Sequence, residues 1–474
     1  MRRIIKFLNK LRKFRPKLGS QQQFEEPCRT SAQQFKKRSL NVSCTKPGDN
    51  TRKRTQCSEQ LETDWKKSNC QLEKPCEEEE EKAEAEAGNE AVWPILKKVL
   101  LMCAGQQKPL YSQADNIEGS LVDVLEVQRF VSDVFMALEV PPKAASEMSD
   151  VLIAADYMGQ RHMGIHRLPA IAADLLNLTV DPRMQPKIIC ERKALALVDG
   201  QNAPGPVVAN FCMDLAMRKA RDEAIGFVAA RHSNNIGMAS WYACQALAQR
   251  LIGLCMTNAP PVLVPSGGIE PLLGGNPISF AASSTCEQFL VDLGMGAQTI
   301  EQLELDYCNG HLTELPSAQL ALDCQGVPTT CAAEALRAQR LHAFQPEYKG
   351  FGLAAMVDVL CGVLTGASYA TQLRRRGIYS THSQSADLGQ IFVAIDPMHF
   401  SARFDERLAD FHQLLRQGSS CNAPLVPGDQ EMLHMQQVDN QGGLIISPCT
   451  LSVLQELGDS FNIDALCVKT CDKQ

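Results

Sequence analysis

With 474 residues, the chain is long enough for one large domain or two ordinary ones, each with a sizeable core. Its composition, 45% apolar and 21% charged, is typical of a soluble globular protein. The net charge of −7 argues against a nucleic-acid-binding body, because no overall positive field attracts phosphates. No apolar run reaches the roughly 20 residues that span a membrane, so no integral membrane segment is expected.

The 19 cysteines are scattered, and no two of them form a C-x-x-C pair. This pattern favours reduced thiols in a cytosolic or mitochondrial compartment over a disulfide framework. His162 and His166 have the i, i+4 spacing of metal ligands on one helix face, but no Glu or Cys ligand lies near them in the sequence. We therefore expect no metal site.

The N-terminal region differs in composition from the rest. Residues 1–18 carry eight Lys or Arg and no acid, and their apolar side chains recur at helical spacing. Such a segment is typical of a mitochondrial transit peptide, and equally of a basic tail that touches anionic surfaces, so the localisation stays mitochondrial or cytoplasmic. Residues 20–89 are polar, lack periodicity and end in an acidic run. Because this composition buries too little apolar surface to offset the entropy of ordering, residues 1–92 are predicted to be a disordered tail.

One folded domain is predicted over residues 118–470, beginning with helices. Apolar residues from Leu121 to Leu138 recur at helical spacing. Pro141 and Pro142 stop that helix, and Pro142 can open the next one, predicted over residues 143–157. Further helices are expected up to Leu178.

Strands and helices then alternate. Residues 224–230 and 251–257 are predicted strands on either side of a helix at 237–250, so part of the sheet should be parallel. The remaining predicted strands are 278–282, 289–293 and 390–395. The remaining predicted helices are 207–220, 350–373, 400–415 and 447–457, with the largest at 350–373.

Residues 154–169, AADYMGQRHMGIHRLP, contain the polar break between two predicted helices. A helix start there would offer unpaired N–H groups and positive dipole to an anion. The stretch resembles the signature A-D-x-x-G-I-D-S-H-G-V-x-R-L-P of the malate/L-lactate dehydrogenase family, which are NAD(P)-dependent oxidoreductases of a non-Rossmann type. In that family the His of S-H-G donates a proton to the substrate keto oxygen, and the following Arg faces the substrate carboxylate. The corresponding residues here are Met163 and Arg167.

Eight further segments resemble motifs of the same family, in the family's order, and the resemblance covers about residues 121–463. They are R-H-S-N-N-I-G (231–237), M-T-N-A (256–259), P-S-G-G to G-G-N-P (265–277), the strand ending at Asp292, D-C-Q-G-V-P-T-T (323–330), Y-K-G-F-G-L (348–353), F-V-A-I-D-P (392–397) and P-G-D (427–429). Any one of these motifs is weak alone, and their common order carries the resemblance.

The resemblance implies an α/β fold with an N-terminal helical part and a mixed sheet, and a homodimer. It implies a small 2-keto or 2-hydroxy acid as the substrate, bound by Arg167 and Asn235. The implied cofactor is NAD or NADP. Its implied contacts are Asp292, Leu293, Gly294, Met295, Gly296, Lys349, Gly350, Pro427, Gly428 and Asp429. The G-x-G-x-x-A at 350–355 is not interpreted as a Rossmann fingerprint, because no strand is predicted directly before it and no suitable acid follows.

The departures from the family pattern concentrate at the chemistry. Met163 cannot donate a proton, since a thioether is only a weak acceptor. His162 is adjacent, but one helical step turns a side chain by about 100°, so His162 can serve only if the backbone shifts. Asn235 stands where the family has a second histidine. The segment after Asp292, itself a candidate catalytic residue, lacks the usual hydroxyl groups.

Three functional hypotheses stay open. The first is a working 2-hydroxy acid oxidoreductase in which His162, a water or another acid replaces the missing histidine. The second is a catalytically weakened paralogue, a pseudoenzyme, with a structural or regulatory role. In the third, the basic tail is the functional part and binds membranes or acidic partners.

Overall fold

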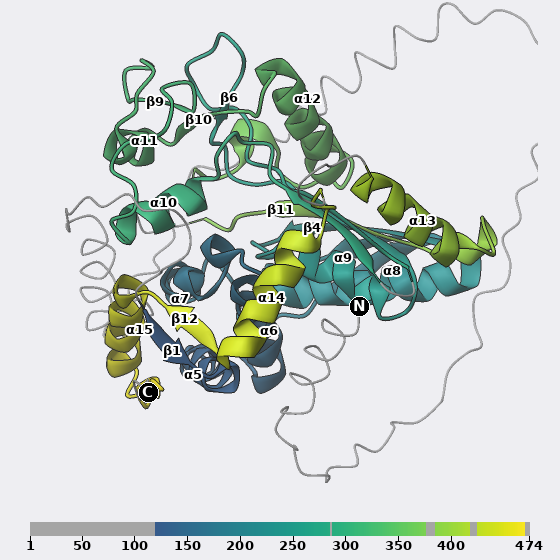
Figure 1. The fold of residues 1–474 in the computed structure, drawn as a ribbon, viewed down its shortest axis with the longest axis horizontal. Helices are drawn as coiled ribbons and strands as arrows, with labels where there is room; N and C mark the ends of the chain where they lie inside the picture. The colour runs from purple at the N-terminus through teal and green to yellow at the C-terminus, as the bar shows by residue number, and fades with distance from the viewer. Residues whose placement is uncertain (1–118, 285–286, 376–383, 418–423, 470–474) are drawn as a thin grey trace, which may run out of the picture. The chain divides into compact units, whose positions relative to one another are not determined.

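The structure is a computed structural model that describes residues 119–284, 287–375, 384–417 and 424–469. Its main feature is a seven-stranded mixed sheet with helices on both faces (Figure 1). The strand order is β2-β3-β4-β11-β5-β7-β8. The predicted disordered tail, residues 1–92, lies outside the described residues.

The strands fall into three sheets. Those of the main sheet are β2 (Lys187–Glu191), β3 (Leu195–Asp199), β4 (Ile225–Ser233), β5 (Ile252–Thr257), β7 (Ile278–Ser283), β8 (Gln288–Leu293) and β11 (Leu388–Ile395). The two small sheets consist of β1 (Ser120–Val122) with β12 (Leu444–Ile446), and of β6 (Leu263–Val264), β10 (Arg340–His342) and β9 (Ala321–Leu322).

The helices surround these sheets. The α-helices are α5 (Val124–Ala137), α6 (Pro142–Tyr157), α7 (Leu168–Leu176), α8 (Gly205–Glu223), α9 (Ala239–Leu247), α10 (Ile300–Cys308), α11 (Ala332–Ala338), α12 (Glu347–Asp358), α13 (Phe404–Arg416), α14 (Asp429–Gln441) and α15 (Pro448–Ser460). The short turns are η1 (Arg161–Met163), η2 (Ile165–Arg167), η3 (Val359–Val363), η4 (Ala370–Gln372) and η5 (Pro397–His399).

Strand β11 forms the centre of the main sheet. It pairs antiparallel with β4 on one side and with β5 on the other. Its side chains alternate between the faces, because Phe392 and Ala394 belong to one hydrophobic core and Ile391 and Val393 to a second. Successive side chains of a strand point to opposite faces of its sheet. When helices cover both faces, side chains on either face are buried, so the strand is apolar at most positions.

The helices on the first face approach the strands closely. Helix α8 packs on β4 and β11, and α9 packs on β5 and β7. A Cβ atom at Gly226 in β4 would lie 2.0 Å from the backbone oxygen of Ala216, and one at Gly253 in β5 would lie 2.2 Å from that of Ala243. These glycines therefore set the distance between the two layers. On the other face, η3 packs on β11 and β4, and α12 packs on β5.

The N-terminal helices pack beside the C-terminal ones (Figure 1). Strand β1 pairs antiparallel with β12, and α15 contacts both α5 and α7. Helix α5 begins where the Asp123 carboxylate accepts a hydrogen bond of 2.9 Å from the Leu125 N–H. Helix α6 begins at Pro142, as the sequence predicts, because a proline at the first helical position lacks only an N–H that needs no partner.

Two expectations from the sequence need correction, and a third is confirmed. Leu121 lies in strand β1 and not in a helix, since pairing with β12 takes precedence over the local periodicity. The longest described helix is α8, with 19 residues. The helix predicted at 350–373 is instead α12 followed by the π turn η3, and the helical conformation has ended by Gly366, which has a φ of +78°. The expectation that part of the sheet is parallel is confirmed: the parallel pair of the main sheet is β3 with β4. Strands β4 and β5 point the same way but do not pair, because β11 lies between them.

Candidate functional site

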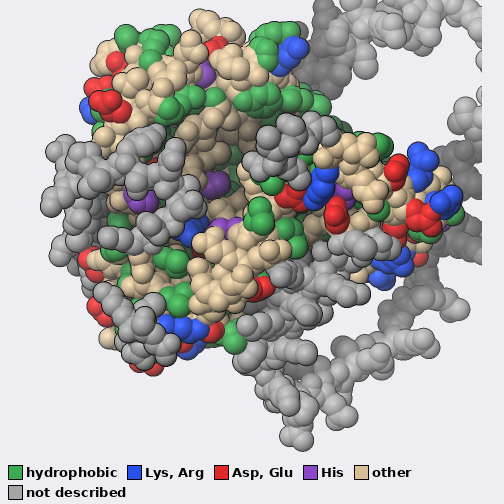
Figure 2. Space-filling model, viewed as in Figure 1, with side chains coloured by type: hydrophobic (Ala, Val, Ile, Leu, Met, Phe, Trp, Pro, Cys, Tyr) green, Lys and Arg blue, Asp and Glu red, His purple; other side chains and the backbone are tan. Residues whose placement is uncertain are grey.

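A cavity of about 1030 Å³ lies where the chain leaves β4, β5 and β8. Its walls come from η1, η2 and α7 on one side, and from α10 and α11 on the other. On the face shown in Figure 2 the surface is hollowed in this region, with histidine side chains in the hollow. The cavity is at the upper end of the usual size range for a small-molecule site, about 300–1000 Å³.

The turn that carries Met163 and Arg167 is held by a buried carboxylate. Helix α6 ends at Tyr157, Gly159 follows with a φ of +86°, and the chain then forms η1 and η2. Asp156 Oδ2 accepts a hydrogen bond of 2.7 Å from the N–H of Ile165, the first residue of η2. A Cβ atom at Gly164 would lie 2.2 Å from the same oxygen, so only glycine fits there. Burial raises the pKa of Asp156 to about 7, against the opposing effects of this hydrogen bond and of the Arg161 charge.

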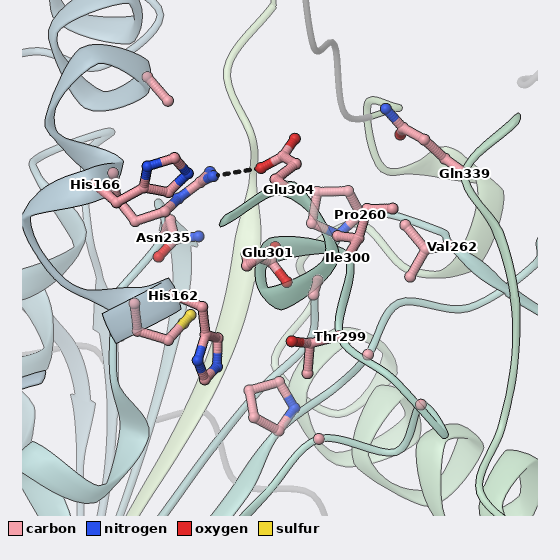
Figure 3. Close-up of a pocket in the computed structure, with 18 of the residues that line it drawn as sticks. His162, His166, Asn235, Pro260, Val262, Thr299, Ile300, Glu301, Glu304 and Gln339 are labelled. Atoms are coloured by element: carbon pink, nitrogen blue, oxygen red, sulfur yellow. Dashed lines mark hydrogen bonds and ion pairs between the residues drawn. The ribbon is translucent and has the colours of Figure 1, made fainter. Parts of the chain in front are cut away.

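Met163 and His162 both line the cavity, but they differ in their surroundings. The Met163 side chain is half-buried and packs against the first hydrophobic core. In Figure 3 His162 lies on the same wall as His166 and Asn235, opposite Thr299 and Glu301 of the α10 wall. Burial lowers the pKa of His162, while the Glu301 charge opposes that effect. His162 is therefore mostly neutral at pH 7.

Arg167 forms an ion pair within the cavity. Its Nη1 atom lies 3.0 Å from Oε2 of Glu304, which comes from α10, and a dashed line in Figure 3 marks the contact. Both side chains are largely buried, with 19% of Arg167 and 15% of Glu304 exposed. The arginine thus faces the cavity as the resemblance implies, but with a carboxylate of the protein beside it.

Asp292 stands at the end of β8 and lines the cavity. Its Oδ2 atom accepts hydrogen bonds from the Ser240 N–H at 3.1 Å and from Gln160 Nε2 at 3.3 Å. Burial raises the pKa of Asp292 to about 6, and the hydrogen bonds from Ser240 and Gln160 limit the rise. A carboxyl group with such a pKa exists in both protonation states near neutral pH.

Asn235 also lines the cavity, on the turn after β4. Its Oδ1 atom accepts a hydrogen bond of 2.7 Å from the Gly237 N–H, which fixes the turn. His232, three residues earlier, lies 3.0 Å from Asp199 through its Nδ1 atom and does not line the cavity. The structure therefore brings Met163, Arg167, Asn235 and Asp292 together around one space.

The predicted cofactor residues divide into two groups. Gly294 and Gly296 line the cavity with Asp292, whereas Leu293 and Met295, which alternate with them, do not. The lining also excludes Lys349, Gly350 and residues 427–429. Lys349 and Gly350 lie in the first turn of α12, and the Pro427 carbonyl accepts a hydrogen bond from the Leu290 N–H at 3.1 Å. Asp429 is bound by Arg416 at 2.8 Å.

The cavity has space for a nicotinamide cofactor against bare backbone. A Cβ atom at Gly275 would meet no atom within 4 Å, and one at Gly294 would meet none nearer than 3.6 Å. Both glycines line the cavity. These residues fit the group that the resemblance implies.

Sequence reasoning missed two acidic residues of the site, Glu301 and Glu304. Both lie on α10, in a segment that carries no family motif. The one local signal is Thr299, whose side chain accepts a hydrogen bond from the Gln302 N–H at 3.2 Å and begins the helix. That signal could have placed the helix, but not its position across from Arg167.

Comparisons with known proteins agree with this fold. The sequence profile of the malate/L-lactate dehydrogenase family matches residues 122–455. Malate dehydrogenase of Pyrococcus abyssi is 33% identical over 282 residues, which are 58% of this chain and 76% of that protein. L-sulfolactate dehydrogenase of Methanothermobacter thermautotrophicus is 29% identical, over 67% of this chain and 90% of its own length. The solved structure of malate dehydrogenase from Pyrococcus horikoshii superposes with a TM-score of 0.67 at 27% identity, over 75% of this chain and all of the other.

The molecule thus has the fold of a non-Rossmann oxidoreductase, with a cavity at the ends of its strands. The chain belongs to the malate/L-lactate dehydrogenase family. Among the residues that the structure describes, no group of three or more His, Cys, Asp or Glu is arranged to hold a metal ion. Within the same residues, every helix is too short or too polar to cross a membrane.

Proposed function

We propose that this protein is an oxidoreductase that transfers a hydride between NAD or NADP and a small 2-hydroxy or 2-keto compound. The observation that carries the proposal is the cavity that collects Arg167, Asn235 and Asp292 at the strand ends. Relatives named malate dehydrogenase, sulfolactate dehydrogenase and ureidoglycolate dehydrogenase (NAD(+)) support the reaction class, and the corresponding acids are the first compounds to test.

The glycine-lined wall is the proposed cofactor site. Asp292, Gly294 and Gly296 would hold the cofactor, together with Gly275 on the facing loop. The bound cofactor supplies the hydride donor or acceptor. For Lys349, Gly350 and residues 427–429 the cofactor contact stays a prediction, because these residues do not line the cavity. We also propose, from the family resemblance, that the protein is a homodimer.

Proton transfer is the step of the proposed reaction for which the site lacks the family's usual residue. Reduction of a keto group needs an acid near the developing alkoxide, and Met163 has no proton to give. His162 lines the same cavity and is the proposed substitute. Because burial lowers the pKa of His162, this side chain holds the required proton less readily than an exposed histidine. Reduction through His162 should therefore accelerate as the pH falls.

A catalytically weakened paralogue is the second candidate function. Met163 and Asn235 favour it, since they replace both of the titratable histidines that the family pattern places at the site. In that case the fold, the dimer and cofactor binding remain, while turnover is lost.

Two measurements on the full chain separate these candidates. Titration of NADH and NADPH, followed by fluorescence, tests cofactor binding, and turnover with malate, lactate, sulfolactate and the matching keto acids tests catalysis. Binding with turnover supports the oxidoreductase, and binding without turnover supports the weakened paralogue. Failure of both cofactors to bind contradicts the proposal.

A further inference from the structure

The contact between Arg167 and Glu304 changes what the cavity can bind. Arg167 is the last residue of η2, and Glu304 lies 137 positions later in the sequence, on α10. Their 3.0 Å contact is a charged hydrogen bond between side chains that are each less than one-fifth exposed. A ligand carboxylate that approaches Arg167 therefore meets a guanidinium whose charge is already paired with a carboxylate of the protein.

The other charges around the cavity do not restore a positive field beside Arg167. Glu301 lies one helical turn before Glu304, and Asp292 also lines the cavity. Of the remaining arginines, Arg374 binds both oxygens of Asp174, at 3.0 and 2.9 Å. Arg375 and Arg337 are exposed at the surface, and Arg375 lies 3.6 Å from Glu270. No arginine of the lining is thus both buried and free of a carboxylate partner shown in the structure.

We propose that Glu304 determines substrate charge: by neutralising Arg167 it disfavours a substrate carboxylate and favours an uncharged 2-keto or 2-hydroxy compound, such as an amide. This inference rests on the proposed function and narrows its substrate class. A carboxylate and a primary amide have the same shape, so charge is the property on which Glu304 acts. The amide N–H groups can in addition donate to Glu304, which a carboxylate cannot do.

Pyruvate and pyruvamide form a pair of probes with the same shape that differ in this charge and in the N–H donors of the amide. We would measure their dissociation constants for the full chain by calorimetry, with and without NADH. The wild type should bind pyruvamide more tightly than pyruvate. Glu304→Gln keeps an acceptor for Arg167 and removes the charge, so it should shift the ratio of the two constants toward pyruvate by about tenfold or more.

Three further variants make the test specific. Asp306→Asn removes one charge from the same helix, at a residue that does not line the cavity. It should change the ratio by no more than about threefold, which is the effect expected of a weak ionic interaction. Adding Arg167→Gln to Glu304→Gln should cancel the gain for pyruvate. Glu304→Ser repeats the test should Glu304→Gln fold poorly, which circular dichroism would show.

The inference and the proposed function fail in different ways. Preference of the wild type for pyruvate, an unchanged ratio in Glu304→Gln, or no pyruvate binding by Glu304→Gln and Glu304→Ser would overturn the role of Glu304. A shifted binding ratio without oxidation of NADH or NADPH by either probe would uphold that role and overturn the reaction.

Discussion

Met163 is the residue on which the rate of the proposed reaction depends. Its side chain faces the cavity while packing against the first core, and an imidazole has a similar bulk, so the site should accept histidine at this position. A placed general acid contributes about 10²–10⁴ in rate. We expect Met163→His to raise kcat for keto reduction by at least about tenfold, with only part of the full effect, because Asn235 stays unable to titrate. Stopped-flow or steady-state oxidation of NADH would measure it.

Two further variants test how a gain of activity in Met163→His should be interpreted. Adding Asn235→His to Met163→His should exceed either single change, with non-additive effects, since both side chains face one space. His162→Ala in the wild-type background reports whether His162 acts as the proton donor. Strong wild-type turnover that vanishes in His162→Ala would show that the enzyme is not weakened, and unchanged rates in Met163→His despite cofactor binding would place the deficiency elsewhere.

The raised pKa of Asp156 should make the stability of the folded protein depend on pH. Its pKa in the folded chain, about 7, lies above the ordinary value of 3.8, so between these values the folded state holds the proton more tightly than the unfolded state. Stability from this group is therefore full at low pH and falls as the pH rises toward 7. Asp156→Asn keeps an acceptor for the Ile165 N–H without the ionisation. It should reduce the fall in unfolding free energy between pH 5 and 8 by about 1–3 kcal/mol.

Urea unfolding at pH 5 and pH 8 would test this expectation. Asp292, with a pKa of about 6, contributes in the same direction, so a residual decline should remain in Asp156→Asn. Identical pH profiles for the wild type and the variant would show that the Asp156 carboxyl is not buried in the way described.

At the scale of elements, the sheet depends on glycines where helices cross it closely. In Gly226→Ala the new methyl group would lie 2.0 Å from the Ala216 carbonyl oxygen, so α8 has to move off β4. Overpacking of this kind typically costs about 1–3 kcal/mol. Gly352→Ala is the matched control, because the added methyl meets no atom within 4 Å and alanine favours a helix, in α12, by about 1 kcal/mol. Thermal unfolding should show a lower Tm for the first variant and an equal or higher Tm for the second, and the reverse order would refute this account.

The sequence predicted those elements whose signal is local. The stop at Pro141 and Pro142 located α6, and the apolar run around Phe392 located β11, because each pattern depends on adjacent residues. The place of β11 between β4 and β5 was not predictable, since pairing partners 130 or more positions away leave no trace in a local pattern. Leu121 shows the opposite failure, in which a clear local period was overridden by a strand partner at the other end of the chain.

The candidate site was predictable where a motif exists. Motif order located Met163, Arg167, Asn235 and Asp292, and the structure places all four around one cavity. Glu304 escaped prediction because a glutamate on an amphipathic helix has no distinguishing pattern, and its meaning comes only from the side chain 3.0 Å away. Charge neutralisation of Arg167 is a property of the fold and not of any segment.

At the scale of the whole molecule, we expect a homodimer. Large apolar side chains are exposed along α12 and η3, among them Met356, Val359 and Val363, and exposed apolar patches commonly mark contact with another chain. Light scattering coupled to gel filtration should give about twice the chain mass of 52.1 kDa. A monomer at micromolar concentration would contradict this prediction and weaken the family-based assignment of the cofactor site.

The central place of β11 has a consequence for biosynthesis. Strands β4 and β5 leave the ribosome more than 130 residues before β11, which bonds to both of them. Until residues 388–395 arrive, the inner edges of β4 and β5 have no partner, and unpaired edges of this kind promote aggregation. The nascent chain is therefore most vulnerable late in translation, and a premature stop before residue 388 would yield a product unable to complete its sheet, however intact its earlier helices.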